Sequence, residues 1–151
     1  MNSPGRLLGV DYGNVRIGLA ISDPDRKIAS PLATYVRRNK DGDAQFFQQL
    51  VREEQVVVLV VGLPVHLSGQ EGQSSAQARA FGKWLNAVTG LPTVLFDERF
   101  TTVEAEAHLL EAGLTSKRRK ARRDRVAAQI LLQSYLDAGC PSEQKIAGLD
   151  Q

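Results

Sequence analysis

The stretch RLLGVDYGNVRIGLAISD, residues 6–23, predicts two β-strands that are joined by a tight turn. Apolar residues dominate both of its halves, RLLGVDYG (6–13) and RIGLAISD (16–23). The pair Gly13-Asn14 stands between them, and a dipeptide of this kind is typical of a short hairpin turn. The stretch therefore predicts an antiparallel hairpin at the start of the fold.

Asp11 interrupts the first of these apolar runs, between Gly9 and Gly13. A carboxylate on an otherwise apolar strand is costly unless it is paired or binds a metal ion. The two glycines leave room for a ligand to approach the backbone. Two other interpretations are an aspartate that forms a turn before glycine, and the phosphate loop of actin-like ATPases. The second needs two such domains around a nucleotide, and a chain of 151 residues is expected to hold one.

The hairpin is followed by alternating strand and helix patterns. VVVLVVGLP (56–64) is continuously apolar, as expected of a central strand that is covered on both faces. Three meandering strands followed by α/β crossovers predict a mixed five-stranded sheet, with its first three strands antiparallel and helices on both faces. This order of elements is that of the ribonuclease H-like fold. The other predicted elements are strands over 29–38 and 93–99, a helix over 43–55 capped by Asp43, a helix from Ser74 or Ser75 to Gly90, a helix from Thr101 or Thr102 to Gly113, and a last helix from Ala121 to about Asp137.

Length and composition indicate one domain over residues 1–151, with a short tail from about residue 140. The single cysteine, Cys140, excludes an internal disulfide and agrees with a reducing compartment. The longest apolar run is about half the ~20 residues that a membrane-spanning helix needs, and the N-terminus lacks the apolar region of a secretory signal. We therefore expect a cytoplasmic protein without a membrane partner.

Basic residues are concentrated in one segment of a chain whose net charge is +2. Residues 117–125, KRRKARRDR, hold seven of the 19 lysines and arginines and one acid, and the rest of the chain has 12 basic and 16 acidic residues. This asymmetry predicts a local site for an anion, which we expect to be nucleic-acid phosphate; a solvated charge run is the alternative. We expect residues 117–120 to form a loop. The predicted contacts are Lys117, Arg118, Arg119, Lys120, Arg122 and Arg123, with Arg16 and Arg99 elsewhere in the chain.

Two acids stand next to each other in FDERFTT (96–102), at the end of a predicted strand. Because successive side chains of a strand point to opposite faces, only one of Asp97 and Glu98 can easily join a shared site. Glu98 alternates with Phe96, whereas Asp97 alternates with Arg99, a candidate ion-pair partner. The residues alone leave open which of the two acids is a metal ligand.

Asp124 stands at the head of the buried stripe of the last predicted helix. Ala127, Ala128, Leu131 and Tyr135 follow it at i+3, i+4, i+7 and i+11. The simpler interpretation is an acid that is favoured by the start of a helix and by neighbouring arginines. It explains less well why this acid shares a face with two small alanines, which let a helix approach a sheet closely.

Carboxylates from the first strand, a later strand end and the last helix are ligands of the kind that Mg²⁺ and Mn²⁺ prefer. Without metal ions, three converging carboxylates would repel one another and raise one another's pKa values. Two such ions, roughly 3.5–4 Å apart, can activate a water molecule and stabilise the leaving oxygen of a displacement at phosphorus. The pattern therefore predicts a hydrolase of phosphate esters with Mg²⁺ or Mn²⁺ as cofactor.

Four motifs, in this order, resemble the bacterial YqgF/RuvX family: GVDYGNVRIGLAISD (9–23), VVGLPVHLSGQEG (60–72), FDERFTTVEAE (96–106) and DRVAAQILLQSYLD (124–137). Members of this family are named as Holliday junction resolvases or as nucleases of the precursor of 16S ribosomal RNA. The resemblance implies a ribonuclease H-like fold and an acidic, metal-dependent site.

The family's acids fall on Asp11, Glu98 and Asp124 of this sequence, so the resemblance implies that these three are the catalytic metal ligands. The family pattern also favours Glu98 over Asp97, which becomes a candidate for a supporting position beside the ligands. The chain departs from the pattern at Arg123, where family members often have an apolar residue before the last aspartate.

Three functions are compatible with these patterns. The first, which we favour, is a metal-dependent nuclease that matures the 5′ end of 16S ribosomal RNA; the second applies the same chemistry to four-way DNA junctions. Paired cuts on a two-fold junction would favour a homodimer. The third is a nucleic-acid-binding protein with a degenerate site, against which the presence of all three acids argues. Contacts from arginine and lysine to phosphate do not distinguish RNA from DNA.

Overall fold

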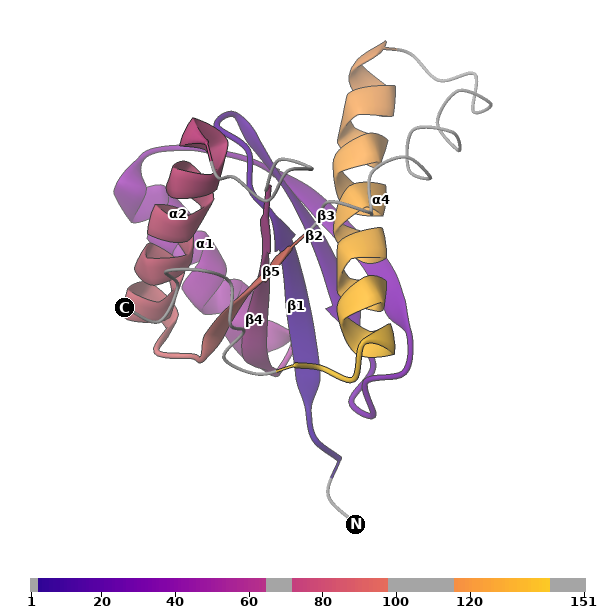
Figure 1. Ribbon diagram of the computed structural model, residues 1–151. Coiled ribbons are helices and arrows are strands. Elements are labelled where there is room, and N and C mark those ends of the chain that lie inside the picture. The colour runs from indigo at the N-terminus through magenta and orange to yellow at the C-terminus, as the bar shows by residue number, and fades with distance from the viewer. Residues whose placement is uncertain (1–2, 65–71, 98–115, 142–151) are drawn as a thin grey trace.

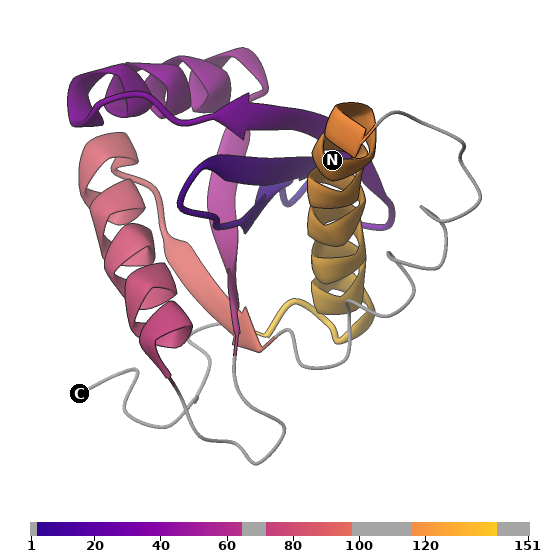
Figure 2. The same cartoon turned by 90° about the horizontal axis from the view of Figure 1, so that it is seen from above.

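The computed structural model describes residues 3–64, 72–97 and 116–141, which form a sheet covered by helices on both faces (Figures 1 and 2). The five strands are arranged in the order β3-β2-β1-β4-β5. β1, β2 and β3 are antiparallel neighbours, β4 is parallel to β1, and β5 is parallel to β4, which confirms the predicted mixed sheet. The strands are β1 (Arg6–Asp11), β2 (Arg16–Ser22), β3 (Ala29–Val36), β4 (Val56–Leu63) and β5 (Thr93–Asp97).

Helices lie on both faces of this sheet, as predicted. α1 (Lys40–Glu53) and α2 (Gln73–Thr89) cover one face, and α4 (Ser116–Asp137) crosses the other, as Figure 2 shows. The first half of α4 lies at the edge of the sheet where β1 ends (Figure 1). That edge is where the site described below is found.

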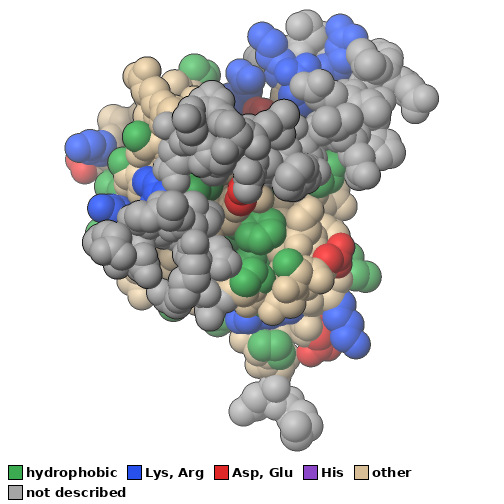
Figure 3. Space-filling model, in the orientation of Figure 1, with side chains coloured by type: hydrophobic (Ala, Val, Ile, Leu, Met, Phe, Trp, Pro, Cys, Tyr) green, Lys and Arg blue, Asp and Glu red, His purple; other side chains and the backbone are tan. Residues whose placement is uncertain are grey.

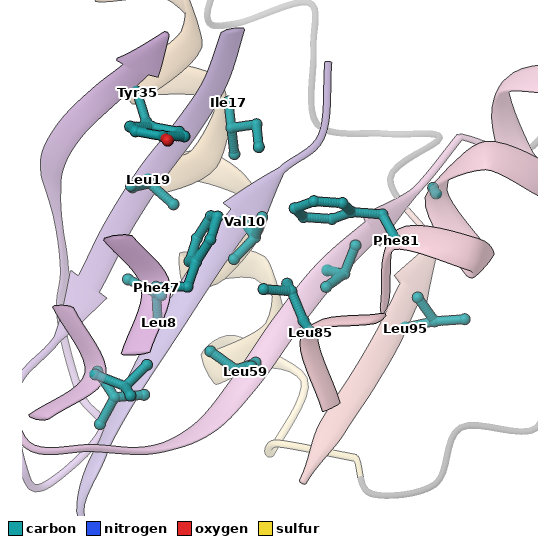
Figure 4. Packing of buried hydrophobic residues seen from close by; sticks show 14 of the residues in the cluster. Leu8, Val10, Ile17, Leu19, Tyr35, Phe47, Leu59, Phe81, Leu85 and Leu95 are labelled. Carbon is teal, nitrogen blue, oxygen red and sulfur yellow. The ribbon is translucent and has the colours of Figure 1, made fainter. Parts of the chain in front are cut away.

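The sheet separates two clusters of buried side chains, because neighbouring residues of a strand point to opposite faces. Leu8 of β1 packs with Phe47 of α1 in the larger cluster, which Figure 4 shows, whereas Leu7 packs in the cluster beneath α4. β4 supplies both clusters, with Leu59 on one side and Val60 on the other. The prediction of a central strand that is covered on both faces is therefore confirmed.

The prediction that Asp43 caps the first helix was wrong. α1 begins at Lys40, and its cap is Asn39, whose side-chain oxygen accepts a hydrogen bond from the Gly42 amide at 2.7 Å. Asp43 is buried one turn inside, where it accepts hydrogen bonds from the Tyr35 hydroxyl at 2.6 Å and the Arg38 amide at 2.9 Å. Burial opposes its ionisation, but these hydrogen bonds outweigh burial and lower the pKa of Asp43.

The start of α2 also differs from the predicted one, whereas its end does not. The helix begins at Gln73, and its cap is Gly72, which offers no side chain; Ser74 and Ser75 lie inside the first turn. The helix ends before Gly90, as predicted. Gly90 adopts the left-handed conformation with φ of 73°, which glycine accommodates at the end of a helix.

The predicted loop over residues 117–120 was wrong, because α4 already begins at Ser116, five residues before the predicted start at Ala121. Lysine, arginine and alanine favour helix, and no glycine or proline interrupts residues 116–137. The helix propensity of these residues therefore outweighs the mutual repulsion of their basic side chains.

The remaining predicted elements are described in part. The strand predicted over 93–99 is observed as far as Asp97, and the helix predicted from Thr101 or Thr102 to Gly113 lies outside the described residues. No helix in the described part of the chain is long and apolar enough to span a membrane.

Candidate active site

α4 lies directly against β1 and β2 because glycines occupy the positions beneath it. A β-carbon at Gly18 would lie 1.9 Å from the carbonyl oxygen of Asp124, and a β-carbon at Gly9 would lie 2.9 Å from the Leu132 side chain. Ala128, whose carbonyl oxygen also faces Gly9, is fully buried. The helix backbone thus occupies the space that side chains would fill at other positions of the sheet.

This contact brings Asp11 and Asp124 to one site. Asp11 is the last residue of β1, and its partner across the hairpin is Gly18, over which the backbone of Asp124 lies. Alternate residues of a strand point to the same face of the sheet, so Asp11 lies on the face of Leu7 and Gly9, which face α4. The structure therefore brings together two of the three predicted acids.

The two carboxylates have different surroundings. The pKa of Asp11 is raised from 3.8 to about 7, mainly because burial disfavours the charged form, and further because the charge of Asp124 repels it. Asp124 is partly exposed and accepts a hydrogen bond from Nε of Arg16 at 2.8 Å. Arg16 was predicted to contact nucleic acid, and the structure places it in this ion pair. Two acids compensated by one arginine are a donor set that suits a divalent cation.

The third predicted ligand, Glu98, lies outside the described residues, as does Arg99. Within residues 3–64, 72–97 and 116–141, no three acids, histidines or cysteines come close enough to hold a metal ion. Asp97 ends β5 with the same strand parity as Leu95, which packs in the cluster beneath α1 and α2, whereas Phe96 packs beneath α4. Strand alternation therefore assigns Asp97 to the face of the sheet away from α4.

A cavity of about 260 Å³ opens beside Asp11, toward the start of α2. Tyr12 forms one of its walls: its ring lies 4.7 Å from the Phe81 ring, and its hydroxyl accepts a hydrogen bond from Arg37 at 3.0 Å. Arg37 in turn pairs with the buried Asp43. This wall was not predicted from the sequence, where the only sign of it is the aromatic residue directly after Asp11. The cavity is lined by Asp11, Tyr12, Gly13, Asn14, Gly62, Pro64, Ser74, Gln77 and Ala78.

Six of the eight basic residues that were predicted to contact nucleic acid lie on the first turns of α4. Figure 3 shows lysine and arginine side chains gathered over this end of the helix. Cations are unfavourable near a helix N-terminus, and no acid is present in the first turn of α4, so this arrangement does not stabilise the helix. The side chain of Lys117 lies outside the described residues. The exposed members of the set are Arg118, Arg119, Lys120, Arg122 and Arg123.

We expect the metal-free protein to lose stability as the pH rises from about 4 to 7, through Asp11. The pKa of this group is about 7 in the folded protein and 3.8 without the fold, so the folded state binds the extra proton over this range. Each pH unit then removes about 1.4 kcal/mol, and the effect levels off above pH 7. Between pH 5 and pH 8, denaturant unfolding in EDTA should show a loss of unfolding free energy that is about 2.6 kcal/mol smaller in Asp11→Asn than in the wild type. Equal losses in the two proteins would contradict the raised pKa.

The sequence matches one protein family along most of its length. The model of the family described as "RuvX: Holliday junction resolvase" matches residues 5–138. A protein of Rhodopirellula baltica named "Putative pre-16S rRNA nuclease" is 50% identical over 144 residues, which cover 95% of this chain and 83% of the relative. A protein of the same name from Moorella thermoacetica is 46% identical over 132 residues, which cover 87% of this chain and 94% of the relative.

The fold is similar to that of two solved resolvases. Thermus thermophilus RuvC in complex with a Holliday junction gives a TM-score of 0.55 at 13% identity, with 91% of this chain and 96% of RuvC covered. The fowlpox virus resolvase in complex with Holliday junction DNA gives a TM-score of 0.55 at 10% identity, with 90% of this chain and 99% of the resolvase covered. At these identities the likeness concerns the fold, and it confirms the predicted ribonuclease H-like class.

Proposed function

The chain belongs to the RuvX family, and on that premise we propose that it is a nuclease that hydrolyses phosphodiester bonds of nucleic acid with Mg²⁺ or Mn²⁺. The observation that carries this proposal is the convergence of Asp11 and Asp124 beneath α4. Bringing a half-buried acid next to a second acid costs free energy, which a purely structural role would not require. A divalent cation bound between them would relieve the repulsion.

The proposed metal ligands are Asp11, Asp124 and Glu98. The alternating sequence pattern supports the third, because residue 98 stands two positions after Phe96, which packs beneath α4. Asp97 has the opposite parity and is proposed to support the site without binding the metal ion.

In this proposal the chain's own residues hold the reactants and the metal ion supplies the charge. A bound divalent ion lowers the pKa of a water molecule and stabilises negative charge on phosphate oxygens. The half-buried carboxylate of Asp11 would hold the ion in its deprotonated form and would give up its proton on binding, since its pKa is raised to about 7 in the metal-free protein. The exposed arginines and lysine on α4 bind the phosphodiester backbone and direct it toward the two acids.

The proposed substrate is RNA, at the 5′ end of the precursor of 16S ribosomal RNA, and the proposed location is the cytoplasm. The relative from Rhodopirellula baltica, which is 50% identical over 95% of this chain, supports this choice by its name.

A four-way DNA junction is the second candidate substrate. The description of the matching family and the likeness to RuvC in complex with a Holliday junction favour it. Paired cuts on a junction with two-fold symmetry would then be made by a homodimer.

Cleavage assays on three substrates test the proposal. Purified protein with Mn²⁺ or Mg²⁺ is offered an unstructured RNA, a precursor fragment of 16S ribosomal RNA and a four-way DNA junction, beside the variants Asp124→Asn and Asp25→Asn. Asp25 is exposed in the turn between β2 and β3 and serves as the matched control. We expect the precursor to be cut by the wild type and the control, and not by Asp124→Asn. Cleavage of none of the substrates, or equal cleavage by Asp124→Asn, would refute the nuclease site; faster cutting of the junction would favour the DNA substrate.

Neutralising the exposed cations of α4 should weaken nucleic-acid binding and flatten its dependence on salt. Each lost phosphate contact reduces the slope of log K against log salt by about 0.7 on a single-stranded RNA, so the triple change Arg118→Gln, Arg119→Gln, Lys120→Gln should reduce it by up to about 2. The control changes net charge equally on α1 and α2, with Lys40→Gln, Arg52→Gln and Lys83→Gln at exposed positions. Fluorescence anisotropy with a labelled RNA measures the binding affinity and its dependence on salt. Equal slopes for the two triple variants would show that the segment is only a charged surface.

A further inference from the structure

The ion pair between Arg16 and Asp124 places a cation on one of the two converging acids. Nε of Arg16 donates to Oδ2 of Asp124 at 2.8 Å, which is a good distance for a charge-assisted hydrogen bond. The ion pairs Arg37–Asp43 and Arg6–Glu54 are longer, at 3.3 and 3.5 Å. One of the two carboxylate oxygens that could bind a metal ion therefore already accepts a hydrogen bond from a guanidinium.

The sheet fixes the backbone of Arg16 beside Asp124. Arg16 is the first residue of β2 and pairs with Val36 of β3, and it has the same strand parity as Gly18, over which Asp124 lies. Its side chain is nonetheless 34% exposed, whereas that of Asp124 is 20% exposed. The partly exposed side chain of Arg16 has solvent beside it into which it could turn, whereas the backbone of Asp124 is held by the contact of α4 with Gly18.

We propose that Arg16 is an internal counter-ion that holds Asp124 in the metal-free protein and is displaced from it when the divalent ion binds. This inference rests on the proposed metal site. A guanidinium and a divalent ion are both cations, and they compete for the same carboxylate because each repels the other at short distance. Once displaced, Arg16 is a free cation at the rim of the site, where it contacts the phosphate of the substrate.

The alternative role for Arg16 makes the opposite prediction. An arginine that remained on Oδ2 and oriented Asp124 for a metal ion on Oδ1 would support metal binding, and its loss would weaken that binding. An arginine that competes with the metal ion lowers the affinity, and its loss strengthens binding. The sign of the change in affinity therefore separates the two roles.

Mn²⁺ binding, measured by the electron paramagnetic resonance of free Mn²⁺ and by calorimetry, tests the proposal. The proteins are the wild type, Arg16→Gln, Arg16→Lys and the control Arg6→Gln, which breaks the ion pair with Glu54 at the other end of β1. We expect Arg16→Gln to bind Mn²⁺ about fivefold more tightly than the wild type, the size of effect expected for a partly exposed ion pair. Arg16→Lys and Arg6→Gln should bind like the wild type. Unchanged or weaker binding by Arg16→Gln overturns the competition, and binding by none of the proteins overturns the metal site as well.

A second measurement follows the metal response of the wild type itself, and a variant serves only to assign the resonance. The Nε–H resonance of Arg16 in ¹⁵N NMR spectra, identified by its absence in Arg16→Lys, should be protected from exchange in the metal-free protein by its hydrogen bond. Titration with Mg²⁺ should remove this protection. A resonance that stays protected at saturating Mg²⁺ would show that Arg16 remains on Asp124 and would overturn the proposal.

Discussion

Asp11→Asn is expected to lower phosphodiester cleavage by at least about 100-fold and to leave the protein folded. Loss of a residue that only supports a metal ligand typically costs 10–100-fold, and the loss of a ligand should cost at least as much. The amide is neutral, so it removes the repulsion by Asp124 and the cost of a buried charge, both of which raise the pKa of Asp11. The metal-free variant should therefore be more stable than the wild type at pH 8, although it is inactive.

Two measurements on the same protein preparation check the predicted loss of activity and gain of stability. Cleavage rates in Mn²⁺ give the activity, and melting temperatures in EDTA and in Mn²⁺ give the stability and its response to metal. The wild type and the control Asp25→Asn should gain melting temperature with Mn²⁺, and Asp11→Asn should not. A variant that cleaves within about twofold of the wild type, or gains as much from Mn²⁺, is incompatible with Asp11 as a metal ligand.

Gly18→Ala is expected to damage the active site through the backbone of α4. The new β-carbon would lie 1.9 Å from the Asp124 carbonyl oxygen, so the helix must move away from the sheet. Overpacking of this kind typically costs about 1–3 kcal/mol of stability. A displacement of about 1 Å at Asp124 should also reduce cleavage by about 100-fold, because catalytic geometry tolerates little error.

Gly82→Ala provides the matched control for this prediction. Its β-carbon would lie 3.2 Å from the end of the Leu95 side chain, in a helix on the other face of the sheet, and a side-chain end can adjust. We expect this variant to have wild-type activity and a stability within about 1 kcal/mol of the wild type, since alanine favours helix. Denaturant unfolding and the cleavage assay distinguish the two variants. Wild-type behaviour of Gly18→Ala would contradict the close contact between α4 and β2.

The parts of the fold that could be predicted are those that the sequence encodes locally. The hairpin depends on two apolar runs and the turn at Gly13-Asn14, and β4 on one uninterrupted apolar run. The helical period alone placed Asp124 at the head of the buried stripe, and the structure directs it to the sheet. These features require no knowledge of distant residues.

The errors arose where the decisive partner lies elsewhere in the fold. An acid before an apolar run has the same pattern whether it caps a helix or is buried, and the partners of Asp43 are Tyr35 and the amide of Arg38, which no local pattern identifies. The pairing of Arg16 with Asp124 joins residues 108 positions apart. Gly18 could be recognised as a glycine inside a strand, a sign of close backbone approach, but the element that approaches it could not.

Crystals grown with Mn²⁺ test the central claim most directly, by anomalous X-ray diffraction at the manganese edge. We expect an anomalous peak within about 2.5 Å of a carboxylate oxygen of both Asp11 and Asp124, with Arg16 turned away from Asp124. The absence of a peak between these two acids at saturating Mn²⁺, or a peak only at other residues, would contradict the account.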